Sequence, residues 1–149
     1  MLGVEESAGF GIQGNVPERD GILSGLLFCE LLAMSGKSLY QLLDDIRQIV
    51  GGLHYKRIDI PAGDIDRDEI FNRCEHFHPS KNLEEFFIEK VRKLYDKETL
   101  NGIKFLFGNS RWLLIRASQT EPLVRIYAEG RTEDELMRLL EEGKKLIKI

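Results

Sequence analysis

The 149-residue sequence has few cysteines and no long apolar run. Its two cysteines, Cys29 and Cys74, lie far apart and form no C-x-x-C pair, so we expect reduced structural thiols instead of a disulfide framework. No window approaches the roughly 18 apolar residues that a bilayer-spanning helix needs. Glu5 and Glu6 stand where a signal peptide has cations and apolar residues. We therefore expect a cytoplasmic protein without a membrane segment.

The sequence also has no excess of positive charge. Lys and Arg number 21 against 25 Asp and Glu, which gives a net charge of -4 at pH 7. Because nucleic-acid affinity comes largely from neutralising phosphates, and no basic stripe is visible, we expect no nucleic-acid partner, although a local basic site fits this composition. The chain is 42% hydrophobic and 31% charged, as ordinary globular proteins are. Its length suits one medium domain, or one small domain plus part of another.

The first third of the chain combines a glycine-rich opening with two apolar helices. The stretch Gly3–Gly14 predicts an irregular loop whose backbone can approach a ligand. Domains usually tie their first residues into a strand or helix, so we expect the strand before this loop to belong to a part that the chain lacks. Amphipathic periodicity then predicts helices over 20–36 and 38–50. Their apolar faces are too large to bury on each other, which predicts a sheet as their partner.

The Gly51-Gly52 pair is the predicted domain boundary, with residues 1–51 before it and 52–149 after it, because the pattern changes there from helical to alternating. The second region is predicted to have strands at 53–60, 103–107, 112–115 and 123–128, and helices at 66–78 and 132–149. Residues 83–94 fit a helical stripe, but the part 88–95 also fits an extended segment that leads to a turn at Asn101-Gly102. This order predicts an α+β domain with helices on one face of an antiparallel sheet.

Capping signals mark the start of each predicted helix. Asp20 is the predicted N-cap of the first helix. In a capping box, the cap side chain accepts a hydrogen bond from an amide three residues on, and a Glu or Gln there reaches back to the cap. The predicted pairs are Ser38 with Gln41, Asp66 with Glu69 and Thr132 with Glu135.

The segment Arg116-Ala-Ser-Gln-Thr-Glu-Pro122, followed by Arg125, places two guanidinium groups and two hydroxyls in a short break between two apolar strands. Arg116 can donate a forked pair of hydrogen bonds to phosphate oxygens, and Ser118, Thr120 and turn amides can donate more. Each charge-assisted bond contributes about 1.5–3 kcal/mol. The composition fits an anion-binding loop, and a polar hairpin turn with surface arginines is the alternative.

Glu5 and Ser7 lie two residues apart in the glycine-rich opening. A carboxylate and a hydroxyl at this spacing can accept hydrogen bonds from, and donate them to, the hydroxyl groups of a sugar. A solvated N-terminal tail is the alternative interpretation.

Two further clusters of polar residues resemble metal sites only superficially. Asp64-Ile-Asp-Arg-Asp68 lacks the glycine and the distal glutamate of a calcium loop, and the helix dipole explains acidic residues at a helix start. Cys74-Glu-His-Phe-His78 offers too few ligands for a closed zinc site and fits a capped helix end. We therefore predict no metal site in this chain.

Together, the two candidate binding segments resemble a known enzyme family. The stretch Gly3–Gly21 resembles the sugar-binding loop and following helix start of the α-D-phosphohexomutases, the phosphoglucomutase/phosphomannomutase family. The segment 116–122 resembles that family's phosphate-binding loop, and the order and separation of the two segments also fit. The resemblance covers nearly the whole chain, as the tail of the family's third domain followed by its fourth.

The resemblance implies a role for each of these loops. Glu5 and Ser7 would hold sugar hydroxyls. The phosphate that does not react would be held by Arg116, Ser118, Gln119 and Thr120, with Arg125 as a helper. The resemblance also implies an incomplete α/β domain followed by a TATA-binding-protein-like α+β domain, and it favours extended structure over 89–95.

The sequence departs from the family pattern in both loops. Gln119 stands where many members have glycine, and a positive φ there would cost about 1–2 kcal/mol. Val4 and Ala8 replace glycines that are common beside the Glu-x-Ser pair, which limits how closely the backbone can approach a sugar.

The resembled family transfers a phosphoryl group between a phosphoserine and a hexose phosphate, through a bisphosphorylated sugar. The chain contains neither a Thr-Ala-Ser-His-Asn-Pro-like loop for the phosphoserine nor an Asp-Gly-Asp-Gly-Asp-Arg-like loop for magnesium. Positioning and charge neutralisation supply most phosphoryl-transfer catalysis, so we expect no catalytic residue, no cofactor and no activity in this chain alone. Magnesium is implied only for the complete enzyme.

We therefore predict the substrate-recognition part of a phosphohexomutase, as a fragment or a truncated product, that binds hexose phosphate weakly. The missing N-terminal domains are its expected partner. The alternative is a non-catalytic phosphate-binding or protein-interaction module derived from the same fold, which the apolar helices permit. Glucose, mannose and amino-sugar phosphates share the hydroxyls that Glu5 and Ser7 would contact, so the sequence does not choose among them.

Overall fold

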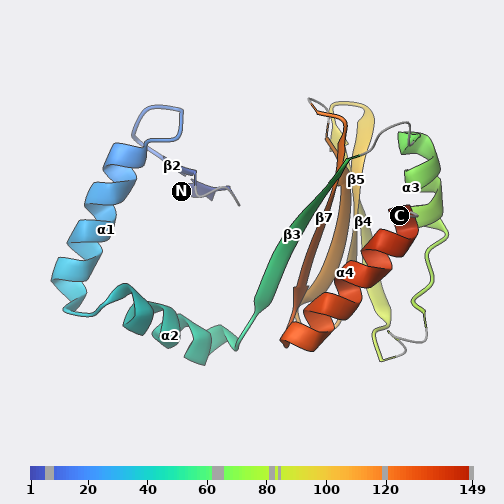
Figure 1. Ribbon diagram of the computed structural model, residues 1–149. Helices are drawn as coiled ribbons and strands as arrows, with labels where there is room; N and C mark the ends of the chain where they lie inside the picture. The colour runs from blue at the N-terminus through green and yellow to red at the C-terminus, as the bar shows by residue number, and fades with distance from the viewer. Residues whose placement is uncertain (6–8, 62–65, 81–82, 84, 119–120, 148–149) are drawn as a thin grey trace. The chain divides into compact units, whose positions relative to one another are not determined.

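The computed structural model describes residues 1–5, 9–61, 66–80, 83, 85–118 and 121–147. The chain divides into two compact units, Met1–Val50 and Gly51–Ile149, and each is described by itself (Figure 1). The first unit holds a small hairpin and two helices, and the second holds a five-stranded sheet and two helices.

The glycine-rich opening forms an antiparallel hairpin, not the irregular loop that its composition predicts. Strands β1 (Leu2–Val4) and β2 (Phe10–Ile12) pair so that Leu2 lies opposite Ile12 and Gly3 lies opposite Gly11. Apolar residues therefore alternate with glycine in both strands. This alternation was the strand signal, but the high glycine content hid it because glycine is typical of loops.

The two predicted helices of the first unit form with the predicted caps. The Asp20 side chain accepts hydrogen bonds from two amides of the first turn of α1 (Gly21–Ser35), at 3.0 and 2.9 Å. Gly36 ends that helix in the left-handed region, at φ 63°. Helix α2 (Leu39–Val50) begins with a reciprocal capping box, in which Gln41 N donates to Ser38 Oγ at 3.3 Å and Ser38 N donates to Gln41 Oε1 at 2.8 Å.

Both helices of the first unit leave their apolar side chains exposed. Neither α1 nor α2 contains a buried residue. The exposed large side chains are Ile22, Leu26, Leu27, Phe28, Leu31 and Met34 on α1, and Leu39, Tyr40, Leu43, Ile46, Ile49 and Val50 on α2. Within the described part of this unit, the strands β1 and β2 are too short to cover such faces, so the sheet partner that the sequence predicts is not supplied here.

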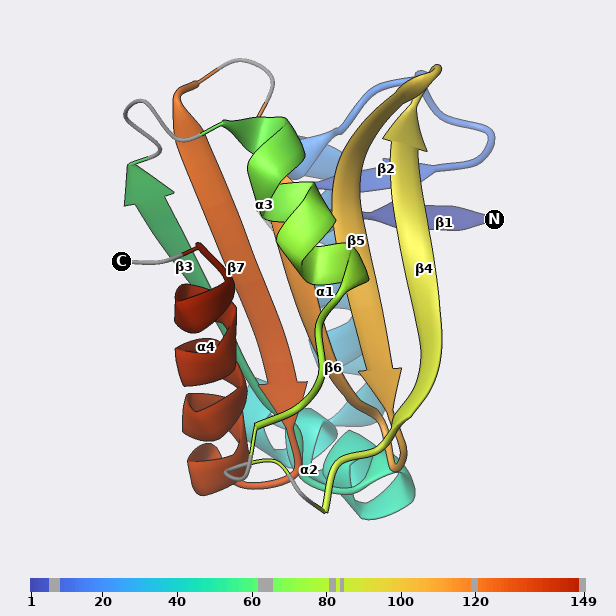
Figure 2. The same ribbon diagram turned by 90° about the vertical axis from the view of Figure 1, so that its right-hand side faces the viewer.

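The second unit is an antiparallel sheet with its helices on one side (Figures 1 and 2). The strands are β3 (His54–Pro61), β4 (Ile88–Asp96), β5 (Thr99–Phe107), β6 (Arg111–Ala117) and β7 (Leu123–Gly130), in the order β3-β7-β6-β5-β4. The helices are α3 (Arg67–Glu75) and α4 (Glu133–Ile147). The predicted α+β class is confirmed. We call the other side of the sheet the helix-free face.

The core of the second unit lies between the sheet and these helices. Alternate residues of the strands point into it, which is why the pattern of the sequence predicted strands here. Its members include Ile103, Phe105, Leu113, Ile115, Val124 and Ile126 from the sheet and Ile70, Leu136, Leu139 and Leu140 from the helices. Gly143 lets α4 lie close to the sheet, since a Cβ there would stand 2.6 Å from Ile126 Cγ2.

One turn is misplaced in the sequence interpretation. Residues 88–96 form strand β4, as the family resemblance favoured, but Asn101 and Gly102 lie inside β5 and do not form the turn. The chain reverses instead around Lys97, which has a φ of 54°. Gly102 serves close packing, because a Cβ there would lie 3.1 Å from the backbone oxygen of Ile115 on the neighbouring strand.

The capping boxes of the second unit form in altered ways. Asp66 caps α3 through Asp68 N at 2.9 Å, while Glu69 pairs with Arg73. At α4, Glu135 N donates to Thr132 Oγ1 at 3.2 Å, as predicted. The Glu135 carboxylate also reaches back to the start of α4, where it accepts from Arg131 N at 2.7 Å, and a backbone hydrogen bond from Thr132 helps to lower its pKa. The prediction for Asp66 and Glu69 is wrong, because Asp66 accepts from Asp68 N and the Glu69 carboxylate pairs with Arg73.

Glu135 and Arg111 form a forked ion pair that holds β6 to the start of α4. Arg111 Nε and Nη2 donate to the two carboxylate oxygens at 2.9 and 2.6 Å. The hydrogen bonds from Arg111 are the main reason why the pKa of Glu135 is lowered. A bidentate pair of this kind fixes orientation as well as distance.

The close approach of β7 to α4 predicts that Gly130→Ala destabilises the second unit. A Cβ at Gly130 would lie 2.8 Å from Leu136 N and 3.0 Å from Glu135 Cβ, so backbone must move. We expect a loss of about 1–3 kcal/mol in the free energy of unfolding. Urea unfolding followed by the fluorescence of Trp112, the single tryptophan, measures it.

Gly52→Ala is the matched control, because a Cβ there meets no atom within 4 Å. Its effect should stay within about 0.5 kcal/mol. Equal unfolding midpoints for the two variants would show that the contact at Gly130 is not tight.

Candidate functional site

The hairpin between β6 and β7 brings the two predicted arginines together. Arg116 on β6 lies directly opposite Arg125 on β7. The turn is closed by Ser118 N, which donates to the Leu123 carbonyl at 2.8 Å. Gln119 and Thr120, which were predicted to hold phosphate with Arg116 and Ser118, lie outside the described residues.

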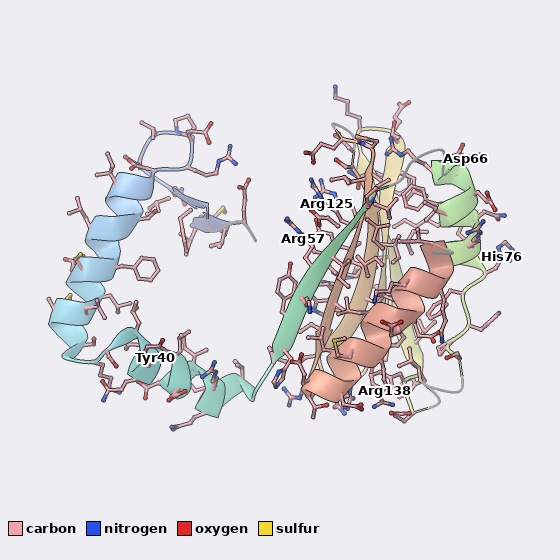
Figure 3. All side chains as sticks on the ribbon, in the orientation of Figure 1. Tyr40, Arg57, Asp66, His76, Arg125 and Arg138 are labelled. Carbon is pink, nitrogen blue, oxygen red and sulfur yellow. The ribbon has the colours of Figure 1, made fainter. Side chains whose placement is uncertain are left out.

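Both guanidiniums belong to the helix-free face. Their strand neighbours Ile115, Ala117, Val124 and Ile126 are buried under the helices, so alternation sends Arg116 and Arg125 to the other side. Figure 3 shows Arg125, with Arg57 of β3, on the side of the sheet away from α4. The arginines therefore project together at one end of the sheet, near Ser118 and Leu123.

Arg125 is held by acidic neighbours that the sequence interpretation missed. Its Nη2 donates to Glu121 Oε2 at 2.7 Å, and its Nε lies 3.8 Å from Oδ2 of Asp59, the residue opposite it on β3. Burial lowers the pKa of Arg125, but Tyr127, Asp59 and Glu121 together outweigh it and raise the pKa. Asp59 could not be found from spacing, because it becomes a neighbour only when β3 pairs with β7.

Arg116 differs from Arg125 in having no such partner. Within the described ranges, no carboxylate or other polar group forms a hydrogen bond or ion pair with it. Two like charges directly opposite each other destabilise a sheet. An anion between Arg116 and Arg125 would relieve that repulsion, and guanidinium donors are well suited to phosphate oxygens.

Glu5, the predicted sugar-binding carboxylate, lies just after β1 in the first unit. Its backbone N donates to the Gly9 carbonyl at 2.9 Å, which closes the hairpin, and its Oε2 accepts from Arg19 Nη1 at 2.8 Å. Gly9 is required here, because a Cβ would lie 2.6 Å from Arg19 Cδ and 2.9 Å from Glu5 Oε2. Ser7 lies outside the described residues.

An open depression of about 440 Å³ lies beside this carboxylate. Its lining residues are Gly3, Val4, Glu5, Gly9, Gly11, Pro17, Glu18 and Arg19. Arg19 is thus a second charged group of the candidate sugar site that sequence reasoning missed. Fourteen residues separate it from Glu5, and no motif connects the two.

Comparisons with known proteins bear on both segments. Residues 1–49 match the family model for the alpha/beta/alpha domain III of phosphoglucomutase/phosphomannomutase, and residues 79–145 match the model for the C-terminal domain of the same enzymes. This chain belongs to the phosphoglucomutase/phosphomannomutase family. It represents a C-terminal part of such an enzyme, since both matched domains lie at that end of the family's order.

Several curated members of this phosphohexomutase family are similar to the chain. A phosphoglucosamine mutase of Methanocaldococcus jannaschii is 34% identical over 131 residues, covering 87% of this chain and 25% of that protein. A phosphoglucosamine/phosphogalactosamine mutase of Sulfurisphaera tokodaii is 31% identical over 99% of the chain and 29% of its own length. A phosphoglucomutase/phosphomannomutase of Thermococcus kodakarensis is 28% identical over 98% and 28%. The chain thus spans about a quarter of the length of these relatives.

The described residues offer no ligand set for the magnesium that the phosphohexomutase family implies. Among them, no group of three or more His, Cys, Asp or Glu side chains could hold a metal ion. Asp64 of the acidic segment 64–68 lies outside the described residues. Both cysteines are free. Burial raises the pKa of Cys74 to about 12, which fits the predicted structural thiol, whereas Cys29 is exposed on α1.

In the described part of the chain, no single helix has both the length and the apolar character needed to cross a bilayer. Helices α1 and α2 meet that criterion only as a pair, with an 81° bend at the break between them.

Because Arg116 has no carboxylate partner among the described residues, we predict that Arg116→Gln stabilises the second unit at low ionic strength. The substitution removes the repulsion between Arg116 and Arg125, so we expect a gain of roughly 0.2–1 kcal/mol. Salt near 1 M should abolish the gain, because the screening length falls to about 3 Å. Urea unfolding followed by Trp112 fluorescence, at low and high salt, measures both values.

Lys56→Gln is the control for this prediction. Lys56 lies on the same sheet, opposite Ala128, and so points to the other face. Its loss should give no comparable salt-dependent gain. A destabilised Arg116→Gln variant at low salt would contradict a repulsive Arg116–Arg125 pair.

Proposed function

We propose that this chain is the substrate-recognition part of a phosphohexomutase and that it binds hexose phosphates. The phosphate that does not react binds at Arg116, Ser118, Gln119, Thr120 and Arg125. The sugar hydroxyls bind at Glu5 and Ser7. The observation that carries this proposal is the direct pairing of Arg116 with Arg125 beside the turn of the phosphate-loop segment.

The phosphate end of the proposal rests on charge and geometry. Arg116 has no carboxylate partner among the described residues, whereas Arg125 is already oriented by Glu121 at 2.7 Å. Two side-by-side guanidiniums provide the planar donors that a dianionic phosphate accepts. Because phosphate neutralises both cations, binding here replaces a repulsive pair with two attractive ones.

The sugar end rests on Glu5. Its Oε2 is held by Arg19, which fixes the carboxylate at the edge of the depression that the hairpin lines. Hydroxyl groups of a sugar can donate to the carboxylate oxygens. Phosphoglucosamine mutases and a phosphoglucomutase/phosphomannomutase are among the relatives, which agrees with a sugar phosphate as ligand.

The chain by itself is proposed to be catalytically inactive. Its sequence contains no phosphoserine loop, and the described residues hold no cluster that could bind a catalytic metal. Affinity should also be weak, because the remaining walls of the cleft that would exclude water from the ligand belong to other domains. The missing N-terminal domains are the proposed partner that completes the enzyme.

Titration with glucose 1-phosphate and with inorganic phosphate, followed by amide chemical shifts, tests the two ends separately. Arg116→Gln and Arg125→Gln should each weaken both ligands by about tenfold or more, because each removes charge-assisted bonds. Glu5→Gln should weaken glucose 1-phosphate and leave inorganic phosphate unchanged. Lys56→Gln should change neither affinity. Shifts absent from both loops in the unaltered chain would refute the proposal.

The exposed apolar helices favour a second candidate function, a non-catalytic interaction module derived from the same fold. Such a module would use α1 and α2, whose large apolar side chains are exposed, to contact another protein. Mixing the chain with a polypeptide that carries the N-terminal domains of a phosphohexomutase separates the two functions. Restored mutase activity supports the enzyme part, and a bound but inert mixture supports the interaction module.

A further inference from the structure

Tyr127 is a buried side chain on the helix-free face of the second unit. Only 4% of it is exposed, yet it does not belong to the hydrophobic core, whereas its strand neighbours Ile126 and Ala128 do. Because alternate residues of a strand point to opposite faces, Tyr127 lies on the side away from the helices. The residues of its row across the sheet, from β3 to β4, are Arg57, Tyr127, Leu114, Lys104 and Arg92.

The hydroxyl of Tyr127 is buried without a hydrogen-bond partner. Among the described residues, none donates to Tyr127 Oη or accepts from it. A buried hydroxyl that forms no hydrogen bond costs free energy, and folded proteins seldom keep one that has no role. Phenylalanine would fill the same space without this cost, so packing alone does not explain the hydroxyl.

Arg125 presents a second unpaired group beside this hydroxyl. It lies two residues before Tyr127 on β7, and Figure 3 shows it on the side of the sheet away from α4. In the described part of the chain its Nε is buried without a hydrogen bond, and Asp59 Oδ2 stays 3.8 Å away, beyond hydrogen-bond distance. Burial alone would lower the pKa of Arg125, but the nearby Tyr127 is foremost among the groups that raise it. An N–H donor and a hydroxyl that can accept therefore lie close together without a bond.

Glu121 explains why these two groups stay unpaired in the free chain. Arg125 Nη2 donates to Glu121 Oε2 at 2.7 Å, which holds the guanidinium in its present orientation. The side chain of Glu121 is 53% exposed and that of Arg125 is 21% exposed, so the carboxylate can move into solvent while the guanidinium stays on the sheet. A dianionic phosphate attracts a cation more strongly than a carboxylate does. It can therefore take over the Nη donors from Glu121.

We propose that Tyr127 is a positioning residue for phosphate recognition, whose hydroxyl accepts a hydrogen bond from Arg125 Nε–H when a phosphate replaces Glu121 at the Nη atoms. This role rests on the proposed function, because Arg125 is the arginine that binds the phosphate there. The new bond fixes the plane of the guanidinium with its Nη donors toward the ligand. Binding then pairs two buried groups that the free chain leaves unpaired, which adds to the affinity.

Tyr127→Phe tests the hydroxyl alone, because it keeps the ring. Calorimetric titration of the full chain should show inorganic phosphate and glucose 1-phosphate each bound about tenfold more weakly by this variant, since both lose one hydrogen bond that involves a charged group. Tyr55→Phe is the matched control. Tyr55 lies on the same face, on β3 opposite Glu129 instead of Arg125, so the loss of its hydroxyl should change neither affinity.

The stability of the free chain separates positioning from a purely structural role. Without ligand, Tyr127→Phe should unfold at the same urea concentration as the unaltered chain or at a higher one, because it removes an unpaired buried hydroxyl. A lower midpoint would show that the hydroxyl is already bonded in the free protein, which would overturn the proposal.

A double-mutant cycle on phosphate affinity measures the coupling between Tyr127 and Arg125. Arg125→Lys keeps the positive charge but removes the Nε–H of the guanidinium, so adding Tyr127→Phe to it should cost no more than about twofold. Adding Tyr127→Phe to Arg116→Lys should still cost about tenfold. Equal losses in the two backgrounds would overturn the link to Arg125.

The chemical shift of the tyrosine Cζ carbon gives a direct readout, because it responds to hydrogen bonding of the phenol. Saturating inorganic phosphate should shift the Cζ resonance of Tyr127 and leave that of Tyr55 in place. An unshifted Tyr127 resonance, or undiminished phosphate affinity in Tyr127→Phe, overturns the role of Tyr127 while the proposed function stands. If the unaltered chain binds neither phosphate nor glucose 1-phosphate, the proposed function fails as well.

Discussion

The pairing of β6 with β7 is the constraint on which the candidate site depends. It sets Arg116 directly opposite Arg125, an arrangement that electrostatics alone opposes. The pairing holds because Ile115 and Ile126, also opposite each other, are buried under the helices. A register slip of one residue would bury the arginines and expose the core. Hydrophobic burial thus holds two arginines directly opposite each other on neighbouring strands.

The same principle shapes the whole helix-free face. Apolar alternate residues fix five strands against α3 and α4, and their polar neighbours are carried to the other side regardless of charge. Carboxylates neutralise only part of the positive charge on this face. Asp59 and Glu121 form ion pairs with Arg125, and Arg57 pairs with Asp59 at 2.9 Å. Under the proposed function, these cations form a preorganised environment for an anion, because the protein bears their mutual repulsion before a ligand binds.

In the first unit, the feature that lacks a partner is apolar surface on the two helices. Helices α1 and α2 form from their own capping signals, yet they contain no buried residue. The chain spans about a quarter of the length of its phosphohexomutase relatives, and residues 1–49 match an alpha/beta/alpha domain. Under the proposed function, the remaining domains would cover these faces, just as a ligand would neutralise the cations of the second unit.

Local signals were sufficient for most of the fold and for part of the site. Periodicity and caps predicted the helices and, except for β4, the strands of the α+β unit, because an apolar stripe and a cap act within a few residues. The β1–β2 hairpin and the position of the β4–β5 turn were not predicted, since glycine fits both a loop and a close strand contact, as at Gly102. The sequence by itself determined that two arginines, Arg116 and Arg125, flank the candidate phosphate-binding segment. Only the tertiary structure decided that Asp59, Lys104 and Arg92 share their face, because strand order joins residues that no spacing in the chain connects.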